Sequence, residues 1–274
     1  MDAGKPSHWD VASEGWLRCS ALYEPFEEPV NNRLIELAEI GTGDDVVDVA
    51  TGIGDPALSV ARRVGPDGRV IATDQSPAML AIAERRARDR GLTNIEFRLL
   101  DANEFDFPEG TIDAIVCRWG LMFLSDLGDA LRRMRQSLKG GRCLAAATWA
   151  DPDKVPIISV RRNVMRAFDL PQGPLDPFRL ASATTLSAAA ASAGFEGVVV
   201  TRAIVPYEYA SAGAFANAQR VAHESRLTAL LARSEEQQAE FWHALSDAAR
   251  PYTAASGVVH MPSEILLLAA RKDR

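Results

Sequence analysis

The chain has 274 residues, of which 47% are hydrophobic and 24% charged, a composition that is ordinary for a globular protein and allows one α/β domain with an insertion. Its formal net charge of −7 argues against a general nucleic-acid-binding protein, which would carry a basic surplus. The chain has three cysteines without metal-ligand spacing, no apolar leader and no apolar run long enough to span a bilayer, so we expect a cytoplasmic protein without a metal site.

The first 40 residues are predicted to form a helical lid. Between Trp9 and Phe26, aromatic and apolar residues recur at helical spacing, which predicts one or two short amphipathic helices broken at Pro25 and Pro29. A separate helix is predicted over 31–40. Tyr23 is a candidate for the wall of a ligand pocket, although packing on the core would explain it equally well.

Between residues 46 and 149, apolar β-branched runs alternate with helical patterns. This alternation predicts an α/β fold, doubly wound, with a mostly parallel sheet and helices on both faces. The predicted strands are 46–50, 69–73, 95–100, 112–117 and 142–149, and the predicted helices are 56–64, 77–90 and 126–138.

The second half of the chain is more helical. Helices are predicted over 157–168 and 182–193, short strands at 198–200 and 203–205, and a last strand over 263–271. Two predicted helices within 211–250 form a cap insertion of about 208–255, which would lie over the strand ends where ligands bind. The expected division is therefore a lid, 1–40, and a domain, 41–274.

The most informative stretch is 46–55, an apolar strand that ends in Gly52 and Gly54. Glycines let the backbone turn sharply and let a ligand come close. Pro56 is expected at the first turn of the following helix, whose N–H groups would favour an electron-rich ligand. With Ala57, the loop satisfies the G-x-G-x-x-A dinucleotide pattern, so an NAD(P)-dependent oxidoreductase is one interpretation.

Acidic residues near the ends of three strands favour a methyl-donor site instead. Asp48 lies inside the first strand, where a carboxylate would oppose a pyrophosphate but suit an amine. Asp74 follows the second strand and could accept from ribose hydroxyls, and Asp101 closes the third and could accept from an adenine amino group. No tyrosine is followed by lysine four residues later, the pair that a short-chain reductase needs.

Residues 40–150 resemble the class I S-adenosylmethionine-dependent methyltransferases. The motifs at 47–55, 72–80 and 100–102 are similar to those of the ubiquinone/menaquinone-biosynthesis methyltransferases (the type 11 group), with Ala50 at the family's first glycine position. The resemblance implies a seven-stranded Rossmann-like sheet with an antiparallel last strand, and S-adenosyl-L-methionine as cofactor, with S-adenosyl-L-homocysteine as product. It implies these cofactor-binding residues: Asp48, Ala50, Thr51, Gly52, Gly54, Asp74, Gln75, Met79, Asp101, Ala102, Arg118, Trp119 and, from the lid, Tyr23.

The acceptor is less defined by the sequence. We expect a small molecule, apolar and aromatic, quinone-like or natural-product-like, methylated on oxygen or carbon. His223 on the inserted helices is the first candidate for a base and Tyr207 the second. The alternatives that stay open are the NAD(P)-dependent oxidoreductase and a catalytically silent binding protein of the same fold. No nucleic-acid partner is expected, and a homodimer is compatible with the chain.

Overall fold

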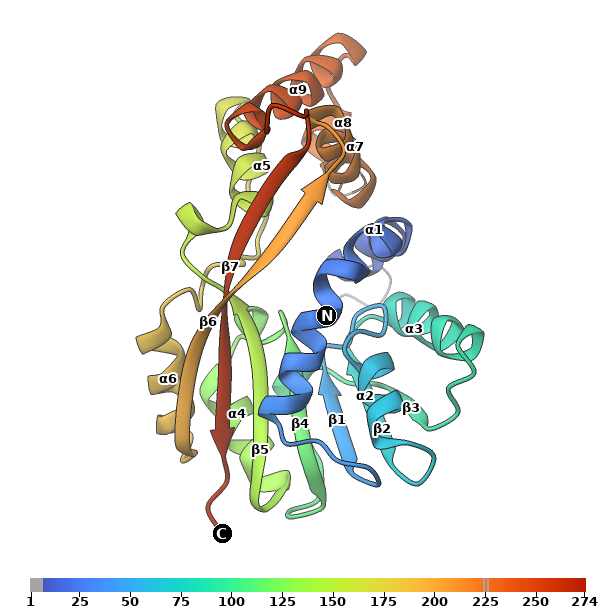
Figure 1. Cartoon of the computed structure of the whole chain (residues 1–274), viewed down its shortest axis with the longest axis vertical. Helices are drawn as coiled ribbons and strands as arrows, with labels where there is room; N and C mark the ends of the chain where they lie inside the picture. The colour runs from blue at the N-terminus through green and yellow to red at the C-terminus, as the bar shows by residue number, and fades with distance from the viewer. Residues whose placement is uncertain (1–6, 224, 226) are drawn as a thin grey trace.

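The centre of the computed structural model, which describes residues 7–223, 225 and 227–274, is a seven-stranded sheet (Figure 1). Its strands follow the order β3-β2-β1-β4-β5-β7-β6. β7 is antiparallel to both neighbours, and the pairs among β1 to β5 are parallel. The predicted sheet with its antiparallel last strand is confirmed. The strands are β1 (Asp45–Val49), β2 (Arg69–Asp74), β3 (Ile95–Leu99), β4 (Ile112–Arg118), β5 (Leu138–Trp149), β6 (Glu196–Tyr209) and β7 (Val259–Arg271).

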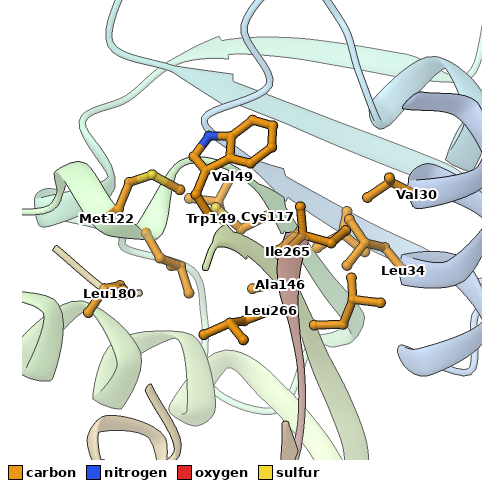
Figure 2. Close-up of a cluster of buried hydrophobic side chains, with 14 of the residues drawn as sticks. Val30, Leu34, Val49, Cys117, Met122, Ala146, Trp149, Leu180, Ile265 and Leu266 are labelled. Carbon is orange, nitrogen blue, oxygen red and sulfur yellow. The ribbon is translucent and has the colours of Figure 1, made fainter. Parts of the chain in front are cut away.

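Helices cover both faces of the sheet, which buries its central strands. Figure 1 shows α2 (Ala57–Val64) in front of the sheet and α4 (Leu127–Ser137) behind it, while α3 (Pro77–Asp89) follows β2 and α6 (Ala183–Ser192) precedes β6. The side chains of β1 from its second residue on are buried, which explains why all of them except Asp48 are apolar. Figure 2 shows part of this core, where Val30 and Leu34 of the first helix lie beside Ile265 of β7.

The N-terminal segment is one helix, α1 (His8–Leu37), so the prediction of two breaks and a separate helix over 31–40 is wrong. Pro25 and Pro29 lie inside it, although each removes a helical hydrogen bond and crowds the preceding turn. The helix continues because tertiary packing outweighs local preference. Its buried side chains, among them Tyr23 and Leu34, face several elements of the core at once.

β6 and β7 extend beyond the sheet as a two-stranded ribbon (Figure 1). The prediction of two short strands is wrong for β6, because residues 199–209 pair with β7 without interruption. The ribbon carries a group of helices that we call the cap: α5 (Pro156–Ala167), α7 (Ala212–His223), α8 (Thr228–Leu231) and α9 (Glu235–Ala248). α5 was not predicted to belong with the insertion, but it packs against α9.

α1 is held closely against the cap. A Cβ placed on Gly15 would lie 2.8 Å from the carbonyl oxygen of Ala222 in α7, so the two helix backbones touch there. Short 3₁₀ helices in the described ranges lie at Ala102–Glu104, Leu121–Phe123, Pro152–Lys154 and Arg250–Tyr252. None of the helices in the described part is long and apolar enough to cross a membrane.

Candidate functional site

A cavity of about 170 Å³ lies at the carboxyl ends of the parallel strands, with α1 across it. Ligands bind at this edge in open α/β sheets because the loops there connect strands to helices that diverge. Of the residues predicted to bind a cofactor, all except Asp48 and Gly54 line the cavity. They are Tyr23, Ala50, Thr51, Gly52, Asp74, Gln75, Met79, Asp101, Ala102, Arg118 and Trp119.

The glycine loop, residues 50–55, forms one wall. Gly52 has φ 56° and Ala50 has φ 57°, both in the left-handed region that glycine tolerates and alanine adopts at a cost. This backbone conformation explains why a glycine suits the position that Ala50 holds. Gly54 turns away from the cavity, because a Cβ there would meet Leu58 and Ala83 at 3.2–3.3 Å; it allows α2 and α3 to pack closely beneath the loop.

Asp48 lies under the glycine loop and does not line the cavity, so any effect on a ligand would act through the loop. Its side chain is fully buried, and its Oδ2 accepts a hydrogen bond of 2.9 Å from the N–H of Ala57. Burial raises the pKa of Asp48 to about 7, against the effect of that hydrogen bond. α2 begins at Ala57, and Pro56 is its N-cap rather than its first residue, so the first N–H of the helix serves Asp48 and not a ligand.

Asp74 connects the glycine loop to α3. One carboxylate oxygen accepts from the N–H of Gly52 at 2.8 Å, and the other accepts from the N–H of Ser76 at 2.9 Å. Burial raises the pKa of Asp74, an effect that these backbone donors oppose. Each oxygen keeps a lone pair, so the carboxylate still has capacity for a ligand hydroxyl. Asp10 of α1 accepts from the hydroxyl of the same Ser76 and thereby fixes the start of α1 beside it.

The third acidic position, Asp101, organises the far end of the cavity. Its Oδ1 accepts from the backbone N–H of Asn103 at 2.9 Å and from the side-chain amide of Asn103 at 2.8 Å. Nearby, Trp9 of α1 packs on Phe123, with ring centroids 5.1 Å apart. Since both rings line the cavity, this end has an aromatic wall next to a carboxylate.

At the end of β4, Arg118 forms the centre of a buried polar group. Its guanidinium lies 3.2 Å from Glu27 and donates to Asn31 at 3.0 Å, both on α1. It also lies over the ring of Trp119, 4.7 Å from the centroid, and Trp119 stacks on Trp149 with centroids 4.5 Å apart. Arg118 is therefore paired, stacked and positioned, with 9% of its side chain exposed.

Neither predicted catalytic residue reaches the cavity. Tyr207 is 1% exposed and lies behind Glu27, to which its hydroxyl donates at 3.1 Å. His223 is 8% exposed and lies behind Trp16, with ring centroids 5.8 Å apart. Tyr207 belongs to the ribbon and His223 to the cap. The unbroken helix α1 separates both side chains from the cavity.

Sequence reasoning did not single out the polar side chains of α1. Glu24, Glu27, Glu28 and Asn31 all line the cavity. Their spacing of three, one and three residues places them on one face of a helix, and this signal was available once Pro25 and Pro29 were read as part of a helix.

Arg86 of α3 secures the wall opposite α1. Its guanidinium donates to the carbonyl oxygen of Ile53 at 2.6 Å, pairs with Asp55 at 2.7 Å and lies 3.5 Å from Glu24. The glycine loop and the lid helix are thus held by the same buried cation, a residue that the sequence analysis did not single out.

Buried polar atoms without a partner gather around the cavity. They include Thr51 Oγ1, Arg118 Nε and Trp119 Nε1. An unpaired buried polar group costs free energy, and a ligand with several polar groups would supply the missing partners. The residues present therefore fit a nucleoside cofactor. In the described ranges, no three His, Cys, Asp or Glu side chains are grouped so that they could hold a metal ion.

Comparison with known proteins agrees with this geometry. Residues 46–141 match the family described as "Methyltransferase domain". The ubiquinone/menaquinone biosynthesis C-methyltransferase UbiE of Pseudomonas fluorescens (strain SBW25) is 34% identical over 135 residues, covering 49% of this chain and 53% of that protein. The chain spans about half the length of the curated relatives it matches.

Solved structures share the fold over most of the chain. The YcgJ protein from Bacillus subtilis superposes with a TM-score of 0.60 at 17% identity, covering 89% of this chain and 98% of that one. The [4+2]-cyclase SpnF superposes with a TM-score of 0.55 at 22% identity, covering 89% and 80%. The matched residues 46–141 contain the glycine loop, Asp74 and Asp101, and this part of the chain is therefore similar to class I S-adenosylmethionine-dependent methyltransferases, among them the ubiquinone/menaquinone-biosynthesis group.

Proposed function

We propose that the protein transfers a methyl group from S-adenosylmethionine to a small-molecule acceptor. The observation that carries this proposal is the joint placement of the glycine loop, Asp74 and Asp101 on one cavity wall, within a domain that matches the methyltransferase family. When bound, the cofactor supplies an electrophilic methyl group on a sulfonium, so the protein need only position the reactants and exclude water.

The chain's own residues divide the cofactor between them. Asp74 would accept from the ribose hydroxyls, Asp101 and Ala102 would meet the adenine edge, and Met79 would pack on the ring. The backbone of the glycine loop would seat the amino-acid part. Asp48 supports the cofactor indirectly, because it fixes the start of α2 beneath that loop.

α1 would act as a lid. Because α1 lies across the cavity of about 170 Å³, it would move aside while the cofactor enters and then close over it. The proposed organisation is a lid over 1–40 and a methyltransferase domain over 41–274, with the cap insertion at about 208–255 behind the lid.

The acceptor end lies near Arg118 and Trp119, at the end of β4. Aromatic side chains from both the lid and the domain surround it, including Trp16, Tyr23 and Trp119. Such walls suit a flat, apolar acceptor such as an aromatic or quinone-like compound, methylated on oxygen or carbon.

Calorimetric titration of the purified protein tests the cofactor assignment. We expect S-adenosylhomocysteine to bind with micromolar or tighter affinity, and NAD(P)H to show no heat of binding. Binding of NAD(P)H with no binding of S-adenosylhomocysteine would establish the oxidoreductase instead. Methyl transfer is then assayed by mass spectrometry with phenols, hydroquinones, amines, thiols and carboxylic acids.

A second candidate is a protein that binds the cofactor without transferring its methyl group. One solved structure with this fold is a [4+2]-cyclase, so the fold alone leaves room for other chemistry. Tight binding of S-adenosylhomocysteine, with no methylated product from any acceptor class, would favour this candidate.

A further inference from the structure

The lid helix α1 carries a carboxylate, Glu27, at the acceptor end of the cavity. None of the contacts proposed for the cofactor involves this side chain. Glu27 lines the cavity, yet 12% of its side chain is exposed and both of its oxygens are already bonded. Oε1 accepts from the hydroxyl of Tyr207 at 3.1 Å, and Oε2 lies 3.2 Å from the guanidinium of Arg118. A carboxylate oxygen has two lone pairs, so each can accept one further donor from the cavity side.

Burying a carboxylate is costly unless it is paired, and the protein pairs it twice. Tyr207 and Arg118 come from two different strands, β6 and β4. They hold the Glu27 side chain in one orientation against the cavity wall. A side chain that only anchored the helix could end in an exposed ion pair, as Glu36 does with Arg33.

The charges that face Glu27 set its proton affinity. Burial raises the pKa of Glu27, Arg118 lowers it, Asp55 of the glycine loop raises it, and Tyr207 and Arg86 lower it. The net direction of the pKa of Glu27 is upward, which makes it a stronger base than an ordinary carboxylate.

The remaining charges on the cavity wall exclude one class of acceptor. The wall carries Glu24, Glu27, Glu28, Asp55, Asp74 and Asp101, and among the described lining residues the cation is Arg118. Arg118 is already paired with Glu27 and stacked on Trp119. A phosphate or carboxylate on the acceptor would therefore meet net repulsion, because the charge of Arg118 is already balanced by Glu27.

We infer that Glu27, delivered by the lid helix, is the base that removes the proton from a neutral acceptor whose nucleophile is an aromatic hydroxyl. This inference rests on the proposed methyl transfer and names its acceptor class and its catalytic residue. Tyr207 is a positioning residue, since it touches Glu27 and not the acceptor.

The step balances in atoms and charge. The acceptor O–H bond breaks and its proton moves to a Glu27 oxygen, while the oxygen's electron pair forms the new O–CH₃ bond. The S–CH₃ bond breaks and its electron pair returns to sulfur. One positive charge on sulfur and one negative charge on Glu27 disappear together, which favours the step inside a closed cavity of low dielectric.

This arrangement links the closed lid to reactivity. Glu27 reaches the cavity only when α1 lies across it, so the base arrives together with the exclusion of water. His223, which lies behind Trp16, has no part in the step.

Binding of two probes tests the inference without catalysis. With the protein saturated by S-adenosylhomocysteine, equilibrium dialysis compares 4-cresol, a phenol that stays neutral at pH 7, with 4-methylanisole, its methyl ether. We expect the wild type to bind the phenol more tightly, and Glu27→Gln to weaken phenol binding about tenfold or more through loss of a charge-assisted hydrogen bond. The ether should bind both proteins alike. Equal binding of phenol and ether by the wild type, or binding of neither, would overturn the inference.

Kinetics give the second readout. Glu27→Gln should lower kcat for a neutral phenol by roughly 100-fold or more and abolish the acid limb of the pH profile, with the affinity for S-adenosylhomocysteine changed less than about threefold. Glu27→Asp should restore part of the activity together with the acid limb. Glu36→Gln, on the exposed end of the same helix, is the matched control and should leave all these values unchanged.

Tyr207→Phe keeps the inference testable if Glu27→Gln does not fold. The hydroxyl of Tyr207 lowers the pKa of Glu27, so its removal should move the acid limb to higher pH. A limb that stays in place contradicts the assignment.

Two further outcomes separate this inference from the proposed function. If Glu27→Gln loses affinity for S-adenosylhomocysteine by tenfold or more, Glu27 holds the cofactor's ammonium group and is not the base. If carboxylates or phosphate esters are methylated and neutral phenols are not, the methyltransferase assignment survives and the acceptor class is wrong.

Discussion

Replacement of Asp74 by asparagine should damage both the glycine loop and cofactor binding, for separate reasons. The carboxylate accepts from two backbone N–H groups, those of Gly52 and Ser76. The asparagine amide offers one acceptor oxygen, so its NH₂ group would oppose one of the two N–H donors. An unpaired buried donor costs about 1–3 kcal/mol, and each kcal/mol lowers Tm by roughly 2–4 °C in a protein of about this size.

The loss of ribose contact adds to this. A hydrogen bond to a charged group contributes about 1.5–3 kcal/mol, so the affinity for S-adenosylhomocysteine should fall roughly 10- to 150-fold. Thermal unfolding of the free protein measures the first effect, and calorimetry measures the second. Asp67→Asn, in an exposed turn, is the matched control and should change neither.

A ligand comparison isolates the ribose contribution. Asp74→Asn should weaken adenosine binding more than binding of 2′,3′-dideoxyadenosine, because the second ligand has no hydroxyls to lose. Equal losses for the two ligands, or an unchanged affinity for S-adenosylhomocysteine, would refute the ribose assignment. An unchanged Tm would refute the role of Asp74 in tethering the loop.

Three further substitutions test the loop and its surroundings. The pKa of Asp48 is about 7 in the folded protein and near 3.9 in the unfolded chain. The folded state therefore binds more protons between about pH 4 and 7. As the pH rises through that window, the free energy of unfolding should fall by on the order of 4 kcal/mol. Asp48→Asn keeps an acceptor for the N–H of Ala57 and should flatten this dependence in denaturant titrations at pH 5 and 8; a wild-type stability that rises across the window would contradict the burial argument. Ala50→Gly relieves a φ of 57° and should raise stability by about 1 kcal/mol, whereas a lower Tm would show that the alanine methyl packs productively. Gly120→Ala places a Cβ 2.6 Å from the sulfur of Cys117 and 2.7 Å from the Cβ of Ala50, so we expect a loss of about 1–3 kcal/mol and weaker binding of S-adenosylhomocysteine; normal values for both would show that β4 can shift.

Local patterns in the sequence were sufficient for the first half of the fold. Short, mainly apolar runs bounded by turn residues define β1, β2, β4 and β5, because strands in the middle of a parallel sheet are buried on both faces, and the alternating run at 95–99 defines the edge strand β3. The acids at 74 and 101 were recognisable as site residues for the same reason. Parallel strands end at one edge, so residues that close successive strands meet there.

The predictions from the sequence were wrong where contacts with distant parts of the chain outweigh a local conformational preference. Prolines at 25 and 29 predict breaks, yet the helix runs through them because its buried face and its acidic face are both held by other elements. The continuity of α1 determines which side chains form this wall of the cavity, since only an unbroken helix places residues 24, 27, 28 and 31 there.

The sequence by itself determined the kind of domain and its cofactor, because both depend on short motifs whose geometry is local. Only the tertiary structure decided which side chains face the cavity. Tyr207 and His223 lie behind the lid in the folded protein. Glu27 and Arg118 are 91 positions apart in the chain, yet their charged groups lie 3.2 Å apart. A contact of that kind depends on the packing of α1 against the whole sheet and cap, and no local pattern encodes it.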